Sequence, residues 1–135
     1  MTPTEIALVQ SSFKSVAPIA EQAADLFYGR LVEIAPEVRP LFPRDLSDQK
    51  KKLMGMLATA VANLHQVETL LPVVQDLGRR HVGYGVTEAH YVPVGEALIW
   101  TLEKGLGPSF TPEVKDAWAA AYATLAGVMT SGGQA

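Results

Sequence analysis

The chain contains no cysteine, and this absence excludes several kinds of chemistry at once. Disulfide bonds, thiolate nucleophiles, Fe–S clusters and thiolate zinc sites all require that residue. Histidine is also scarce, with three among the 135 residues. A site that needs a neutral nitrogen ligand for a metal must therefore use His65, His81 or His90.

The chain also lacks a strong excess of charge of either sign and any long apolar run. The formal net charge is −3 and no long basic block occurs, so nothing in the sequence indicates nucleic-acid binding. No stretch approaches the ~18 uninterrupted apolar residues of a transmembrane helix. The N-terminus has no basic region leading into an apolar run, as a secretory signal would. We expect no membrane insertion and a cytoplasmic location.

What is present is a composition typical of one globular domain. Apolar residues make up 48% of the chain and charged residues 19%, which indicates a folded rather than a disordered chain. A chain of this length can bury a core and one cofactor-sized pocket. We predict a single domain over residues 1–130 and a disordered tail over 131–135.

The first half of the chain shows helical spacing of apolar residues and no useful strand alternation. Thr2 and Glu5 have the spacing of a capping box that opens a first helix, which is expected to end near Pro18. A second helix carries Leu26, Phe27, Leu31 and Ile34 on one side. Three prolines in residues 35–43 predict a short helical turn followed by a corner.

The second half continues in the same way. Ser47 or Asp48 is expected to cap a third long helix. A shorter helix is predicted over 69–81, and another from 87 or 88 to 106. Thr111 as N-cap and Pro112 at the first helical position predict the last helix. Its core stripe consists of Val114, Ala117, Trp118, Ala121, Tyr122, Leu125, Val128 and Met129. We predict an all-α domain of six to eight helices crossing at large angles, and not a simple four-helix bundle.

His81 stands near the end of one predicted helix. Considered alone, a histidine there is a capping or core residue, or a cation favoured by the helix dipole, more often than a metal ligand. Its surroundings change that judgement. Three motifs occur in order along the chain: Pro36-Glu37-Val38-Arg39-Pro40-Leu41-Phe42, Asp76-Leu77-Gly78-Arg79-Arg80-His81 and His90-Tyr91-Val92-Pro93-Val94-Gly95.

With these motifs the chain resembles bacterial single-domain globins of the Vitreoscilla haemoglobin and flavohaemoglobin-domain type. The resemblance covers almost the whole chain apart from the final residues. It implies a globin fold enclosing a haem b pocket, with His81 as the proximal ligand of the iron. The second imidazole nitrogen would then donate to a carbonyl or side chain that sets the tautomer. Tyr91 takes the place of a tyrosine near that histidine; the alternative is a core aromatic with a satisfied hydroxyl.

The resemblance also implies a distal side. Phe42 matches the corner phenylalanine against the haem face, although it would be a core residue in either case. Tyr28 matches a distal tyrosine whose hydroxyl donates to bound dioxygen; otherwise it is an interfacial tyrosine. Gln49 falls at a distal glutamine and could donate to the ligand or to Tyr28, or be a solvated residue. Leu53 would limit distal space or serve as ordinary core.

Three functions follow from the resemblance. The first is reversible binding of dioxygen, nitric oxide or carbon monoxide at five-coordinate ferrous haem iron. The second is nitric oxide dioxygenation, with Tyr28 and Gln49 at the catalytic site and a separate reductase as electron donor. The third is a haem-free sensor or interaction module.

The chain departs from the family pattern on the last helix. The place of the glutamate that completes the proximal network falls near Gly133, and no acidic residue follows Asp116. A weaker push on the iron favours reversible ligand binding over O–O activation.

Overall fold

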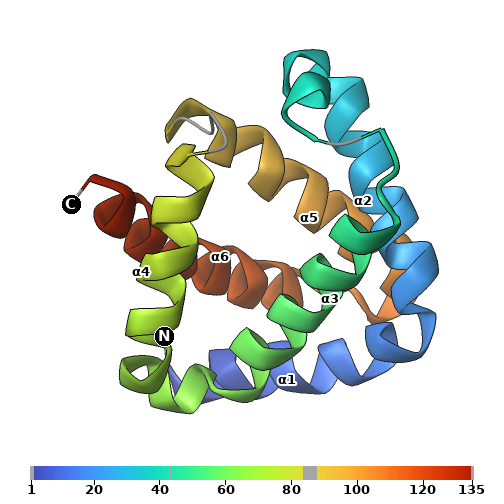
Figure 1. Ribbon diagram of the computed structural model, residues 1–135. Coiled ribbons are helices and arrows are strands. Elements are labelled where there is room, and N and C mark those ends of the chain that lie inside the picture. Colours follow the sequence, from blue (N-terminus) through green and yellow to red (C-terminus); the bar gives the residue numbers. More distant parts are fainter. Residues whose placement is uncertain (1, 43, 84–87, 135) are drawn as a thin grey trace.

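The computed structural model describes residues 2–42, 44–83 and 88–134, with side chains except those of 67–70, 77, 81–83, 88 and 129–134 (Figure 1). The predicted all-α architecture is confirmed in these ranges. They form six α-helices: α1 (Pro3–Val16), α2 (Ala20–Ile34), α3 (Ser47–Ala62), α4 (Val67–Gly83), α5 (Tyr91–Leu106) and α6 (Pro112–Gln134). Short 3₁₀ turns occupy Ala17–Ile19, Pro36–Leu41, Leu64–Gln66, Glu88–His90 and Gly107–Ser109.

The helices cross one another and do not lie side by side as a parallel bundle (Figure 1). The most extensive packing is of α4 on α6, of α2 on α5 and of α1 on α6. Helix α6 therefore supports two other helices at different points along its length. None of the helices in the described ranges is both long and apolar enough to cross a membrane.

Several predicted helix ends are confirmed by their hydrogen bonds. The Thr2 amide donates to Glu5 Oε1 at 2.8 Å and the Glu5 amide donates to Thr2 Oγ1 at 3.1 Å, which completes the capping box. Helix α1 ends at Val16, and Pro18 lies in the following 3₁₀ turn. Thr111 Oγ1 accepts from the Val114 amide at 3.3 Å at the start of α6.

The predicted cap of α3 is wrong. The N-cap position is Leu46, whose side chain makes no cap hydrogen bond, and Ser47 is the first helical residue. Asp45 explains why Ser47 does not act as the cap. Its carboxylate accepts from the Ser47 amide at 2.9 Å and from the Ser47 hydroxyl at 2.7 Å. These bonds from Ser47 hold the pKa of Asp45 below its usual value. The Ser47 hydroxyl donates to that carboxylate and makes no bond to the first turn.

Three other boundaries differ from the sequence-based expectation. Helix α4 begins at Val67 and ends at Gly83, so it is longer than the predicted 69–81 and contains Pro72. Helix α5 begins at Tyr91, after the 3₁₀ turn Glu88–His90. Helix α6 continues through 131–134, the segment expected to form a tail.

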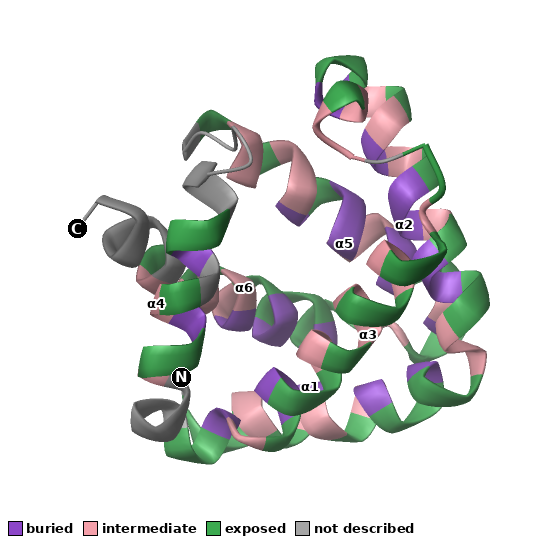
Figure 2. Ribbon diagram, in the orientation of Figure 1, coloured by how far each residue is buried: buried purple, intermediate pink, exposed green. Residues whose placement is uncertain are grey.

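Each of the six α-helices carries buried residues (Figure 2). On α6, Val114, Ala117, Trp118 and Ala121 are buried, which confirms that part of the predicted stripe. Tyr122, Leu125 and Val128 of the same stripe are half-buried, and the side chain of Met129 lies outside the described residues.

One polar contact ties α1 to α6 inside this core. Trp118 is 2% exposed, and its indole Nε1 donates to Ser12 Oγ at 2.8 Å. The Ser12 hydroxyl in turn donates to the Leu8 carbonyl at 2.7 Å. The Phe13 ring packs beside the indole, with ring centroids 6.2 Å apart. Ser12 therefore satisfies the hydrogen-bonding need of a buried donor.

Replacing Ser12 by alanine should destabilise the fold. The substitution leaves the Trp118 N–H unpaired, which costs about 1–3 kcal/mol of the free energy of unfolding. Ser11→Ala is the matched control, because Ser11 is exposed on the same helix and experiences the same change in helix propensity. Urea denaturation of both variants measures the difference. Equal stabilities would show that the indole contact contributes nothing.

Candidate functional site

A cavity of about 510 Å³ lies between the helices and is called here the central cavity. Its volume is in the range of sites that bind small molecules and cofactors. Among the described residues, its walls come from α2, α3, α5 and α6, from the corner 36–42, and from Leu64, Arg80 and His90. Most of the lining side chains are aliphatic or aromatic, so the cavity suits a large, mainly apolar ligand.

An aromatic group forms one wall of the central cavity. The Tyr28 ring packs edge-on against Phe27, with centroids 5.0 Å apart, and edge-on against Phe42 on the other side at 5.5 Å. Phe27 and Tyr28 are consecutive residues of α2, whereas Phe42 ends the proline-rich corner. The corner therefore closes the wall by placing its aromatic side chain on Tyr28.

The Tyr28 hydroxyl is held inside this wall. Tyr28 is 4% exposed, and its hydroxyl donates to the backbone carbonyl of Gln49 at 3.4 Å. A bond of that length is weak, so the hydroxyl can turn to a better acceptor at modest cost. Burial raises the pKa of Tyr28 above its ordinary value of 10.0. The phenol therefore remains a hydrogen-bond donor at neutral pH.

Tyr91 of α5 and Tyr122 of α6 meet where these two helices contact each other. The Tyr122 hydroxyl donates to the Tyr91 carbonyl at 2.5 Å. The Tyr91 side chain packs against Val74 of α4, the helix whose backbone carries His81, and Leu125 of α6 packs against the same valine. Burial raises the pKa of both phenols, and the Tyr91 phenol adds to the effect at Tyr122.

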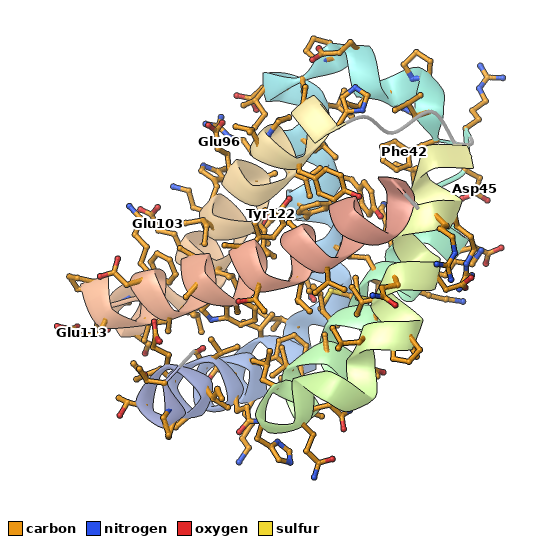
Figure 3. All side chains as sticks on the ribbon, turned by 90° about the vertical axis from the view of Figure 1, so that its left-hand side faces the viewer. Phe42, Asp45, Glu96, Glu103, Glu113 and Tyr122 are labelled. Carbon is orange, nitrogen blue, oxygen red and sulfur yellow. The ribbon has the colours of Figure 1, made fainter. Side chains whose placement is uncertain are left out.

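Gly95 makes the Tyr122 contact possible. A Cβ atom at Gly95 would lie 2.8 Å from Cε2 and 3.1 Å from Cδ2 of Tyr122. Figure 3 shows the Tyr122 side chain reaching from α6 toward α5, while Glu96 and Glu103 of α5 point away from the molecule. A glycine inside a helix is costly by itself, so its place here is explained by the close approach of the ring.

Cationic and polar side chains border the central cavity at a few points. Lys52 and Arg80 line it, and so does the half-buried His90. Arg80 also pairs with Asp76 at 2.7 Å. Lys50 is directed elsewhere, because its Nζ pairs with Asp25 of α2 at 2.7 Å. The cavity thus joins an apolar interior to side chains that attract carboxylates.

The structure brings most of the sequence-predicted site residues together. Tyr28, Phe42, Gln49, Leu53 and Tyr91 all line the central cavity. The sixth, His81, lies in helix α4 by its backbone, and its side chain lies outside the described residues.

Other contributors were not singled out from the sequence. Tyr122 appeared there only as part of a core stripe, and Met56 was not named, yet both line the cavity. The glycine at position 95 inside the predicted helix was the available signal for Tyr122. His65 is exposed.

A family model described as Globin matches residues 25–129 of the chain. The flavohemoprotein of Bordetella parapertussis is 33% identical over 128 residues, which are 90% of this chain and 32% of that protein. The flavohemoprotein of Bacillus subtilis is 32% identical over 84% of this chain and 30% of its own length. The chain therefore spans about one third of the length of these relatives.

Solved structures of similar fold cover nearly the whole chain. A bacterial globin from Campylobacter jejuni superposes with a TM-score of 0.83 and 26% identity, covering 98% of this chain and 96% of that one. An engineered carbene transferase, made from a candidate nitric oxide dioxygenase of Rhodothermus marinus, superposes with a TM-score of 0.90 and 25% identity. It covers 99% of this chain and 94% of that one.

Substituting Gly95 by alanine should disturb the junction of α5 and α6. The new Cβ atom would displace the Tyr122 ring, at a cost of about 1–3 kcal/mol in the free energy of unfolding. Gly55→Ala is the matched control, because Gly55 lies in α3 with no atom within 4 Å of a built Cβ. That control should gain about 0.5–1 kcal/mol. Denaturant unfolding of the two variants tests this; a gain at both positions would contradict the close contact.

Proposed function

The chain belongs to the globin family, and on this basis we propose that it holds haem b in the central cavity and reversibly binds dioxygen and other diatomic gases there. One observation carries the proposal. Five side chains selected from the sequence as haem-site residues line a single cavity of about 510 Å³. They come from α2, α3, α5 and the proline-rich corner.

The residues of the central cavity fit a haem. The aliphatic and aromatic walls suit the apolar macrocycle, and Phe42, which lines the cavity, would pack against its face. Lys52 and Arg80 are suited to hold the two propionate carboxylates. His81 would supply the protein's ligand to the iron, from the helix that packs on Tyr91. When bound, the haem supplies the iron atom that coordinates the gas.

The chain's own contribution on the distal side is a proton donor in an apolar setting. The Tyr28 hydroxyl keeps its proton at neutral pH, because burial raises its pKa. It can leave the weak bond to the Gln49 carbonyl and donate to a polar ligand. Gln49 and Leu53 line the same space, so they would add a second donor and limit the volume. These contacts should slow the release of dioxygen.

Nitric oxide dioxygenation is the second candidate. The structural likeness to the engineered Rhodothermus marinus protein, with a TM-score of 0.90, favours it. Forming one nitrate ion from dioxygen and nitric oxide consumes one electron, which a separate reductase would have to deliver. Sustained nitrate formation with a reductase distinguishes this activity from a single turnover of a gas-binding protein.

His81→Ala should remove the protein's iron ligand. We expect the reconstituted variant to lose the Soret band of the wild-type protein, or to show it displaced by altered coordination. His65→Ala is the control, because His65 is exposed in the turn before α4. Absorption spectra after titration with haemin measure the effect. A wild-type spectrum for His81→Ala would rule out the proximal assignment.

Tyr28→Phe should speed the release of dioxygen. The change keeps the ring packed between Phe27 and Phe42 and removes the hydroxyl. Losing one hydrogen bond of about 1.4 kcal/mol corresponds to a roughly tenfold faster dissociation rate. Tyr122→Phe makes the same change where the hydroxyl donates to a backbone carbonyl, and its rate should stay near wild type. Stopped-flow spectroscopy measures the dioxygen dissociation rate of both variants. An unchanged rate for Tyr28→Phe would show that the phenol does not reach the ligand.

A further inference from the structure

One ion pair links the start of α3 to α2. Lys50 Nζ lies 2.7 Å from Asp25 Oδ1, and the two side chains are 32% and 57% exposed. Three further ion pairs among the described side chains each join residues of a single helix, α2 or α4. The pair of Lys50 and Asp25 differs from these because it connects two helices, and its lysine is mostly shielded from solvent.

This ion pair lies next to the two polar residues assigned to the distal side of the central cavity. Asp25 stands three positions before Tyr28 on α2, which makes the two residues neighbours on the helix surface. Lys50 directly follows Gln49 on α3. The bond from the Tyr28 hydroxyl to the Gln49 carbonyl, at 3.4 Å, is a second link between the same two segments. That bond is long and therefore weak, so the shorter, charged contact is the stronger of the two.

Other polar contacts hold the first turn of α3 to the segment just before it and not to α2. The amide and the hydroxyl of Ser47 both donate to Asp45. The N-cap residue Leu46 makes no cap hydrogen bond and packs against the core instead. The pKa of Asp45 is lowered mainly by Ser47 and in addition by the positive charge of Lys50. Lys50 is therefore the residue through which this turn is attracted to α2.

We propose that Lys50 and Asp25 are positioning residues for the distal side, because their ion pair keeps Gln49 beside Tyr28 so that one ligand can accept from both side chains. The proposal rests on the proposed gas-binding function. Neither Lys50 nor Asp25 lines the central cavity, so both act on a ligand through the position of α3. Without the pair, the first turn of α3 moves away from α2. Dioxygen then leaves faster, since the donor at position 49 is withdrawn.

Neutralising either partner should speed the release of dioxygen. Asp25→Asn and Lys50→Met each remove one charge and nearly keep the size of the side chain. From the usual strength of partly exposed ion pairs, we expect dissociation about 1.5- to 5-fold faster in either variant, measured by stopped-flow spectroscopy. The double variant should be no faster than the single ones, because each single change already breaks the pair. Accelerations that add in the double variant would contradict the proposal.

Glu21→Gln and Lys51→Met are the matched controls. Both residues are exposed, they lie on α2 and α3, and the two substitutions change the net charge in the same way as the test variants. Their dissociation rates should stay near wild type. Rates as high as those of Asp25→Asn and Lys50→Met would show that the charge of the whole chain, and not the ion pair, controls the release.

Salt separates an electrostatic role of the pair from a purely steric one. Between about 0.01 and 1 M ionic strength the Debye length falls from about 30 to about 3 Å, and partly exposed ion pairs weaken. The dissociation rate of the wild-type protein should therefore rise with salt toward that of Asp25→Asn, whose own rate should change little. Equal salt dependence of the two proteins would overturn the proposal.

A second background tests whether the pair acts through Gln49. Gln49→Leu removes the side-chain donor of that residue and leaves its backbone carbonyl. In this background Lys50→Met should have no further effect on dissociation, because the donor that the pair positions is already absent. The full acceleration by Lys50→Met in the Gln49→Leu protein would show that the pair does not act through the glutamine side chain.

The spacing of α2 and α3 is also measurable without any gas. The ¹³Cζ NMR shift of Tyr28 in the purified chain, assigned by its loss in Tyr28→Phe, reports the hydroxyl bond to the Gln49 carbonyl. It should change in Asp25→Asn and not in Glu21→Gln. Absence of a Soret band would reject haem binding, while this comparison still stands. Normal haem and gas binding with an unchanged release rate in Asp25→Asn would reject the positioning role alone.

Discussion

The packing of the Tyr122 ring against the backbone of Gly95 brings α6 close to α5, and the walls of the central cavity that these helices supply depend on that approach. Helix α6 contributes Trp118 and Ala121 to those walls, and α5 contributes Val94 and Leu98. A displacement of the Tyr122 ring would therefore alter several walls together. The absence of a Cβ atom at Gly95 is what allows the ring to lie so close to α5.

The sequence predicted correctly those helix ends that are formed by hydrogen bonds between residues close together in the chain. The capping box of Thr2 and Glu5 and the Thr111 cap each depend on residues three apart, and both form as expected. The start of α3 was mispredicted because Asp45, just outside the expected helix, takes both hydrogen bonds of Ser47. The buried part of the α6 stripe followed from its spacing.

The candidate site was predictable to the extent that motifs and the family resemblance point to its residues. Phe42 and Tyr91 lie in the quoted motifs, whereas Tyr28, Gln49 and Leu53 follow from the resemblance. All five line one cavity. Tyr122 was not selected, because its partner Tyr91 is 31 residues away and their contact arises from the crossing of two helices.

The acceptor for the Tyr28 hydroxyl is the main chain at position 49 and not the glutamine side chain. Every amino acid carries that carbonyl, so evolution can change the side chain at this position without removing the resting partner of the phenol. The fold thus separates two properties that a side-chain acceptor would have coupled. The backbone at position 49 fixes the orientation of the Tyr28 hydroxyl when no ligand is bound. The side chain at position 49 determines the polarity and size of the neighbouring space. Gas affinity could therefore diverge between relatives through one position while the tyrosine stays in place.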